Sequence, residues 1–185
     1  MNYHYSTLLH LPFILSSETL QASRRDAHGD HDAGLLWFST NKTMERTALK
    51  GSVGAIRYCC AGDEVQPWRG VARSVGFCSG TMRRLEASGR KMGATPSEWR
   101  AMVGNMDLSD VDRIEVRIAG GWHGVERAAL HVEDVAGGAV LLHGPGGLVA
   151  TVVRHRTADG YFAYATNSDS CRMDRLLCTA LREAS

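Results

Sequence analysis

Glycine divides the second half of the chain into short apolar runs, and this pattern constrains the fold more than any other feature of the sequence. The runs lie at residues 129–132, 139–142, 148–153 and 161–165. Runs of this length between turn residues suit strands and are short for helices, so we expect hairpins or a meander. The Gly-Pro-Gly-Gly sequence at residues 144–147 predicts one of the turns.

Other stretches predict a mixture of strands and short helices. Residues 111–118 alternate between apolar and charged side chains, which predicts a half-buried strand. Further strands are expected at residues 2–6, 35–41 and 53–60, with a short helix near Pro12, a helical region at residues 67–99 and a last helix capped by Ser168 or Asp169. Regular βαβ alternation is missing, so we expect an α+β fold with a largely antiparallel sheet and short helices.

Length and composition predict one globular domain. The 185 residues divide into strands and a helix at 1–66, a helical basic insert at 67–100 and a sheet-rich remainder at 101–185. Lys and Arg number 21 against 20 Asp and Glu, so the whole-chain charge does not attract a polyanion. The apolar run at residues 8–15 is too short to span a bilayer, so we expect a cytoplasmic protein that does not bind membranes.

The cysteines indicate reduced thiols. Their number is odd and their spacing lacks the CxxC pairs of zinc sites and redox dithiols; they are Cys59, Cys60, Cys78, Cys171 and Cys178. A polar cluster formed by His28, Asp30, His31 and Asp32 matches no metallohydrolase spacing, and we interpret it as a flexible loop. We therefore predict no metal site.

Three short motifs near the N-terminus point to a function. Residues 3–7 read YHYST, residues 11–15 read LPFIL, and residues 36–41 read LWFSTN. Together they resemble the opening of ADP-ribosyltransferase-like proteins, particularly the DarT-type toxins, over about the first 45 residues. The resemblance implies an ADP-ribosyltransferase-like fold, with NAD as a substrate. It also implies transfer of ADP-ribose to a macromolecular acceptor, either protein or nucleic acid.

The resemblance also implies roles for particular residues. His4 would hydrogen-bond a ribose hydroxyl, and Tyr5 would form a wall of the same pocket. Alternation along the strand puts Trp37 and Ser39 on one face and Phe38 and Thr40 on the other, so only one pair can face the pocket. We favour Phe38 with Thr40.

Cleavage of the nicotinamide glycosidic bond also needs a carboxylate near the developing positive charge. Glu115, on the polar face of its strand, is the first candidate, and Glu45 is the second. In the arginine-modifying branch of the family an acidic residue stands two positions before the catalytic Glu; here that position is Arg113, which disfavours that branch. The plainer alternative is that His4 bonds a neighbouring carbonyl and that the aromatic strand is ordinary core.

Residues 71–85 support a competing interpretation, a helix-turn-helix that binds DNA. Ala72 allows close helix crossing, Gly76 makes the turn and Ser79 caps a second helix. The candidates for DNA contact on this second helix are Thr81, Arg83 and Arg84. Residues 67–100 contain seven Lys or Arg and two Asp or Glu, so the segment is locally basic.

A third possibility is an interaction protein that needs no site, such as a phage or prophage product that inhibits a host factor. Trp68, Trp99 and Trp122 would be anchors of such an interface if they were exposed, although burial in the core is the commoner use of tryptophan.

Overall fold

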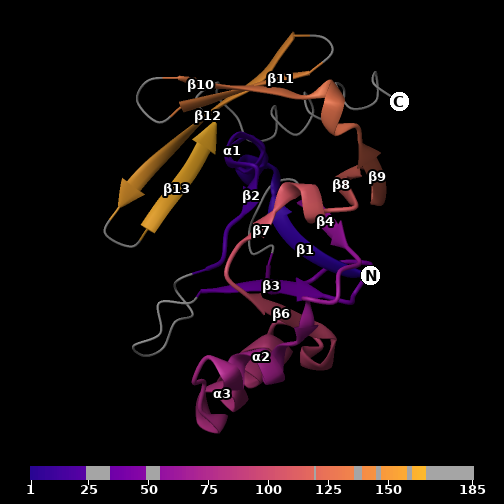
Figure 1. Cartoon of the computed structure of the whole chain (residues 1–185), viewed down its shortest axis with the longest axis vertical. Coiled ribbons are helices and arrows are strands. Elements are labelled where there is room, and N and C mark those ends of the chain that lie inside the picture. The colour runs from indigo at the N-terminus through magenta and orange to yellow at the C-terminus, as the bar shows by residue number, and fades with distance from the viewer. Residues whose placement is uncertain are drawn as a thin grey trace. The chain divides into compact units, whose positions relative to one another are not determined.

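The computed structural model is an α+β structure built on antiparallel strands (Figure 1). Among the described residues the largest sheet has seven strands, in the order β5 (Gln66–Pro67), β6 (Trp99–Val103), β3 (Leu35–Ser39), β1 (Asn2–Thr7), β4 (Ala55–Cys60), β8 (Arg113–Ile118) and β9 (Gly121–Val125). A second sheet contains β10 (His131–Val135), β11 (Ala139–Gly144), β12 (Gly147–Thr157) and β13 (Gly160–Ala165), and β2 (Thr19–Leu20) pairs with β7 (Met106–Asp107). The expected α+β class, with a largely antiparallel sheet and short helices, is confirmed.

The structure describes residues 1–23, 34–48, 55–118, 120–135, 139–144, 147–157 and 160–165. Contacts divide the chain into two units, the first made of Met1–Ser6, Thr19–Gly51 and Arg57–Arg113, and the second of Thr7–Glu18, Ser52–Ile56 and Ile114–Ser185. The helical segment predicted at residues 67–100 lies within the first unit. None of the helices in the described ranges is long and apolar enough to cross a membrane. Several predictions concern residues outside these ranges: the C-terminal helix, the cluster at residues 28–32, Cys171 and Cys178.

In the first unit, two helices pack on one face of strands β3 and β6. They are α2 (Trp68–Ser74) and α3 (Ser79–Lys91), and Figure 1 shows both beside β6. Burial of each large apolar side chain in the core between helices and strands stabilises the fold by about 1.5–3 kcal/mol. The buried residues of this core are Leu35, Trp68, Ala72, Phe77, Met82, Trp99 and Ala101. Trp68 and Trp99 are thus core residues rather than exposed anchors.

The turn between α2 and α3 has the geometry that the sequence predicted, with one difference. Gly76 has a φ of 86°, a left-handed conformation that favours glycine, and the N–H of Phe77 donates to the Ala72 carbonyl at 2.9 Å. The prediction that Ser79 caps α3 is wrong. Cys78 is the N-cap, and its Sγ accepts a hydrogen bond from the Thr81 N–H at 3.4 Å.

A buried carboxylate joins the two helices. Glu86 on α3 is 4% exposed; it accepts hydrogen bonds from Arg69 of α2 at 2.6 and 2.8 Å and from Arg90, one turn along α3, at 3.2 Å. The Arg69 guanidinium binds both carboxylate oxygens, a geometry that adds specificity as well as energy. Glu86 therefore fixes the position of α2 on α3.

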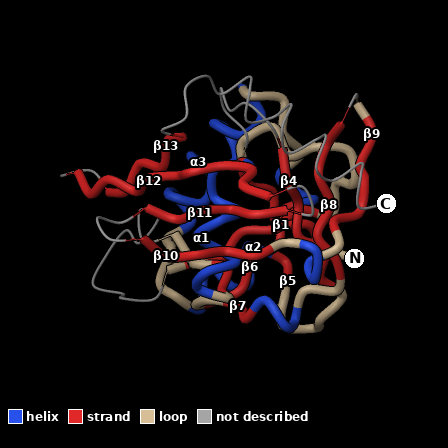
Figure 2. The backbone as a smooth tube through the Cα atoms, turned by 90° about the horizontal axis from the view of Figure 1, so that it is seen from above, coloured by secondary structure: helices blue, strands red, loops and turns tan. Residues whose placement is uncertain are grey.

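The second unit contains the glycine-punctuated meander. β10, β11, β12 and β13 pair in chain order, and Figure 2 shows β10, β11 and β12 running side by side. Gly144 pairs with Gly147 at the predicted Gly-Pro-Gly-Gly turn. In the same unit, the short helices η1 (Leu8–His10) and α1 (Leu11–Ser17) follow each other, and Ser16 donates to the Asp134 carboxylate at 2.8 and 2.9 Å.

Strand β8 shows the predicted alternation, with buried Ile114, Val116 and Ile118 between more exposed neighbours. The remaining short elements are η3 (Pro96–Glu98), η4 (Leu108–Asp110) and η5 (Arg127–Ala129).

Replacing Glu86 by Gln is expected to lower the free energy of unfolding by about 1.5–3 kcal/mol, because the charge-assisted hydrogen bonds to two arginines are lost. Arg69 lowers the pKa of Glu86, so this stabilisation is fully present above the ordinary carboxyl pKa and is lost as the pH falls through the lowered value. Urea unfolding of both proteins at several pH values measures this, with the exposed Glu126→Gln as control. An acid dependence unchanged by Glu86→Gln contradicts it.

The Cys78 thiol is expected to react as a thiolate near neutral pH. Hydrogen bonds from the Thr81 side chain first, and then from the backbone at Thr81 and Gly80, lower the pKa of this exposed thiol to about 7. Alkylation followed by peptide mass spectrometry should give a half-maximal rate for Cys78 near that pH, while buried Cys59 stays unmodified in the folded protein. Thr81→Val should move the Cys78 midpoint upward; an unmoved midpoint would mean that the Thr81 hydroxyl does not lower this pKa.

Candidate functional site

The first unit contains a cavity of about 350 Å³ between the sheet and α3. Its size lies near the lower end of the range for small-molecule pockets, about 300–1,000 Å³. Thirteen residues line it: Tyr3, His4, Tyr5, Trp37, Phe38, Glu45, Thr47, Ala48, Leu85, Ser88, Gly89, Met92 and Trp99. They come from β1, β3, the start of β6, α3 and residues 45–48.

Aromatic side chains form the sheet side of the cavity. Tyr3 lies opposite Ser39, and Ser39 lies opposite Trp99, so their side chains share one face of the sheet. Tyr5 and Trp37 are two residues along their strands from Tyr3 and Ser39 and point the same way. The Trp37 ring is 5.6 Å from Trp68 and 6.2 Å from Trp99, so a packed group of indoles supports this wall.

The helix side of the cavity comes from one stripe of α3. Leu85, Ser88 and Gly89 of α3 and its C-cap residue Met92 are spaced three and four residues apart and therefore face the same direction. A Cβ added at Gly89 would overlap Cη2 and Cζ2 of Trp99. Glycine at this position is what allows the indole to pack against the backbone of α3.

Glu45 is the buried carboxylate of the cavity. It is 6% exposed, and its Oε1 accepts hydrogen bonds from the Thr47 N–H at 3.2 Å and the Thr47 hydroxyl at 2.9 Å. Its Oε2 accepts no hydrogen bond from any residue that the structure describes. Thr47 thus fixes the orientation of the carboxylate while the second oxygen keeps its capacity for a ligand.

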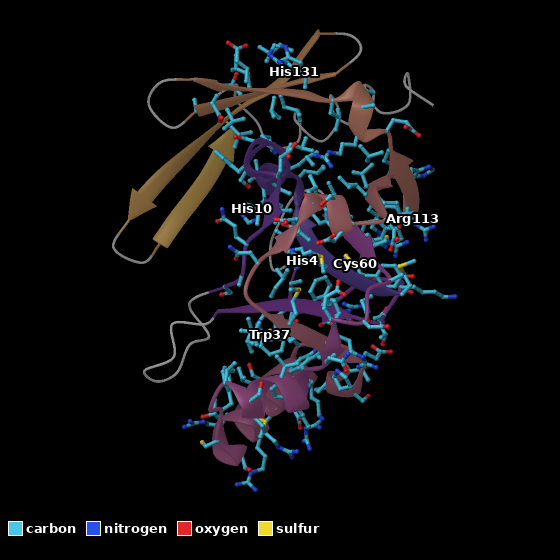
Figure 3. The ribbon with its side chains drawn as sticks, viewed as in Figure 1. His4, His10, Trp37, Cys60, Arg113 and His131 are labelled. Atoms are coloured by element: carbon cyan, nitrogen blue, oxygen red, sulfur yellow. The ribbon has the colours of Figure 1, made fainter. Side chains whose placement is uncertain are left out.

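His4 joins β1 to β3 through its side chain. Its Nδ1 donates to the Trp37 carbonyl at 2.8 Å, and because a carbonyl only accepts, the hydrogen of the neutral ring is on Nδ1. Its ring lies 5.7 Å from Phe38 and 5.9 Å from Tyr58. Figure 3 shows His4 and Trp37 on opposite sides of β3, with Trp37 on the side of the helices.

Tyr5 is a buried phenol held by polar groups. Its hydroxyl donates to the Asn41 carbonyl and is hydrogen-bonded to Arg57. Burial raises the pKa of Tyr5 to about 12, against the opposing effect of Arg57. The Arg57 guanidinium lies 4.5 Å from the centre of the Tyr3 ring and donates to the Lys42 carbonyl. These contacts tie β1 and β4 to the segment that leads to Glu45.

The orientation of the 37–40 strand differs from our expectation. We expected Phe38 and Thr40 to face the site, but the register puts Trp37 and Ser39 on the face that α3 covers. Atoms of Trp37 and Phe38 both line the cavity, whereas Ser39 and Thr40 are not among its lining residues. Ser39 Oγ accepts from the Asn41 N–H at 3.1 Å, and the Thr40 N–H donates to the Glu98 carbonyl at 2.9 Å.

Glu115, the first candidate for the catalytic carboxylate, belongs to the second unit. It lies on β8 opposite Gly124 of β9 and is half-buried. The described lining of the cavity contains Glu45 and does not contain Glu115. The structure therefore brings together His4, Tyr5, Trp37, Phe38 and Glu45, and leaves Ser39, Thr40 and Glu115 outside the lining.

The residues proposed for DNA contact lie on α3 away from the cavity lining. Thr81 is 9% exposed. Its hydroxyl contacts Cys78 Sγ at 3.4 Å and accepts a hydrogen bond from Arg84 at 3.2 Å, so it already has hydrogen-bond partners in the first turns of α3. Arg83 and Arg84 are exposed. Arg69 and Arg90 of the same basic segment bind Glu86, which reduces the positive charge available to a phosphate backbone.

Several lining residues were missed by sequence reasoning. Tyr3 lies two residues before Tyr5 on the same strand, so period-two alternation was the signal that could have found it. Trp99 and the α3 stripe carry no local motif, because only the pairing of β3 with β6 and the packing of α3 bring them to the cavity.

Comparison with protein-family models, with curated proteins and with solved structures finds no match. In the described part of the chain, no group of three or more His, Cys, Asp or Glu side chains is arranged to hold a metal ion. The cavity is therefore interpreted from its own residues.

Gly89→Ala is expected to destabilise the protein by about 1–3 kcal/mol and to change the cavity, because the new methyl group overlaps the Trp99 ring. Gly80→Ala in the same helix is the matched control. Its nearest atom would be Cys78 Sγ at 3.8 Å, so it should stabilise by about 0.5–1 kcal/mol. Chemical denaturation measures both; equal effects of the two substitutions would show that the Gly89 contact is unimportant.

Proposed function

We propose that the protein is an ADP-ribosyltransferase-like enzyme that binds the nicotinamide end of NAD in this cavity and transfers ADP-ribose to a macromolecular acceptor. The proposal rests on the location of the candidate residues around one cavity. Five residues selected on the N-terminal motifs and on chemistry contribute atoms to the lining of a single cavity, namely His4, Tyr5, Trp37, Phe38 and Glu45. Tyr5 and Trp37 lie on the face of the sheet that α3 covers, whereas the rings of His4 and Phe38 pack against each other on the opposite face. The five residues come from two strands and a following loop, and a plain core strand would not require a cavity beside it.

The size of the cavity limits which part of NAD it would hold. At about 350 Å³ it suits the nicotinamide ring and the attached ribose, with the diphosphate and adenosine lying outside. The rings of Tyr5 and Trp37 would flank the nicotinamide.

The reaction would proceed by breaking the bond between C1′ and the nicotinamide nitrogen. The electron pair of that bond goes to the ring nitrogen, and nicotinamide leaves as a neutral molecule. The nucleophilic atom of the acceptor forms the new bond to C1′ and loses its proton to Glu45 or to solvent. Positive charge develops on the ribose during bond breaking, and a fixed carboxylate stabilises it.

Within this proposal Glu45, rather than Glu115, is the carboxylate. Glu45 lines the cavity, and Thr47 holds one of its oxygens while the other takes no hydrogen bond from the described residues. A carboxylate fixed before the substrate arrives needs no reorganisation during the reaction. The ribose-binding role of His4 stays a prediction; the Nδ1 atom of its ring already bonds the Trp37 carbonyl.

The acceptor is proposed as a protein or nucleic acid. Arg83 and Arg84 offer an exposed basic patch for a polyanionic acceptor. DNA binding without chemistry, and inhibition of a host factor by surface contact, are the competing functions, and neither requires the cavity.

Incubation with adenylate-labelled NAD and a cell extract tests the proposal. The wild-type protein should release nicotinamide and transfer the label to macromolecules. Glu45→Gln should lower kcat on the order of 100-fold, since it keeps the shape of the side chain and removes its charge. The exposed carboxylate variant Glu64→Gln, which lies outside the cavity lining, should retain the wild-type rate. Absence of NAD turnover by the wild type, or full activity of Glu45→Gln, would refute it.

A further inference from the structure

Three side chains with metal-binding chemistry share one face of the β10–β11 pair in the second unit. His131 of β10 lies directly opposite His143 of β11, and Glu133 lies two residues after His131, so all three point to the same side of the sheet. Asp134 points to the other side, where it accepts hydrogen bonds from Ser16 of α1. Figure 3 shows the His131 side chain on the side of β10 away from the position of α1 in Figure 1. Solvent reaches this face, since His131 and Glu133 are exposed.

The contact between His143 and Glu133 is too long for a hydrogen bond. His143 Nε2 and Glu133 Oε2 are 3.7 Å apart, whereas hydrogen bonds from nitrogen to oxygen span about 2.7–3.2 Å. His143 Nε2 is shielded from solvent and has no hydrogen-bond partner among the described residues. In a tetrahedral zinc site, with zinc–nitrogen distances of about 2.0–2.1 Å, two ligand atoms lie about 3.4 Å from each other. These two atoms are thus separated by nearly the distance that a shared ion requires.

His131 supplies a second imidazole beside this pair. The ring centres of His131 and His143 are 6.0 Å apart, with an angle of 43° between the ring planes. A tetrahedral ion bound by two imidazole nitrogens holds the ring centres about 5–6 Å apart. No three His, Cys, Asp or Glu side chains of the described residues already surround one point, so binding requires the exposed His131 ring to rotate about its side-chain bonds.

We propose that His131, Glu133 and His143 bind a divalent transition-metal ion of the zinc type, with the fourth position left to water. Two imidazoles and one carboxylate are a ligand set that proteins use for Zn²⁺, whereas Mg²⁺ and Ca²⁺ prefer oxygen ligands. The ion joins β10 to β11. Spacing along the chain does not indicate this site, because strand pairing brings the two histidines together. It lies in the second unit and does not rest on the proposed transferase function, whose cavity is in the first.

Isothermal titration of the full chain with Zn²⁺ tests the proposal, with Mg²⁺ as a probe that should not bind. The variants His131→Gln, Glu133→Gln and His143→Gln should each lower the affinity for Zn²⁺ at least about tenfold, because each removes one ligand. His123→Gln removes an exposed imidazole of β9 and is the matched control, which should retain the wild-type affinity.

A second control addresses the other histidine-rich part of the sequence. The cluster at residues 28–32 also contains two histidines and two aspartates, so His28→Gln with His31→Gln should leave the zinc affinity of the β10–β11 site unchanged. Circular dichroism of each variant establishes that it is folded before affinities are compared.

Chemical modification locates the ion in the wild-type protein without any substitution. Diethyl pyrocarbonate acylates accessible imidazoles, and peptide mass spectrometry should show that Zn²⁺ protects His131 and His143 but not His123. Full affinity in any of the three ligand variants, protection confined to other histidines, or absence of zinc binding overturns the proposal. Turnover of NAD does not bear on these outcomes, so this proposal and the transferase function fail independently.

Discussion

The indole of Trp99 lies against the bare backbone of α3 at Gly89, and this contact sets how closely the helix approaches the sheet. Beyond the contact, the stripe from Leu85 to Met92 stands over the tyrosines of β1 and leaves the cavity between them. Trp37 and Trp68 support Trp99 from the side. Gly89 and Trp99 also line the cavity, so the close contact borders the space, and the rigid indoles do not collapse into it.

The energetics of Glu45 connect this packing to chemistry. Removing a carboxylate from water is costly unless hydrogen bonds or a counter-charge replace the lost solvation. Thr47 supplies two hydrogen bonds to one oxygen, and a ligand would supply the rest. Glu86 shows the alternative: it is equally buried, but Arg69 and Arg90 satisfy both of its oxygens, so it serves stability. Two buried glutamates of one unit therefore have different hydrogen-bond partners.

Features that depend on local pattern were predictable from sequence. Alternation correctly predicted that Ile114 and Val116 are buried. The turn at residue 76 was also predictable, because its positive φ favours glycine and Gly76 is the residue there. Predictions that depended on long-range pairing were less successful. The face presented by Trp37 follows from the register with β1 and β6, which alternation alone leaves ambiguous. Which carboxylate lines the cavity likewise depends on tertiary packing, and the lining contains Glu45 and not Glu115. The N-cap of α3 was predicted as Ser79 rather than Cys78 because sequence rules favour serine at this position and a thiol is a weak acceptor.

The stacked tryptophans also make the molecule its own optical probe. Trp37, Trp68 and Trp99 have ring centres 5.6 to 6.2 Å apart, close enough for their excited states to couple and to share absorbed energy. Two of these chromophores border the cavity. Occupation of the cavity by any molecule that quenches or reorients one indole therefore alters the fluorescence and the near-ultraviolet dichroism of the whole group, without a label being attached.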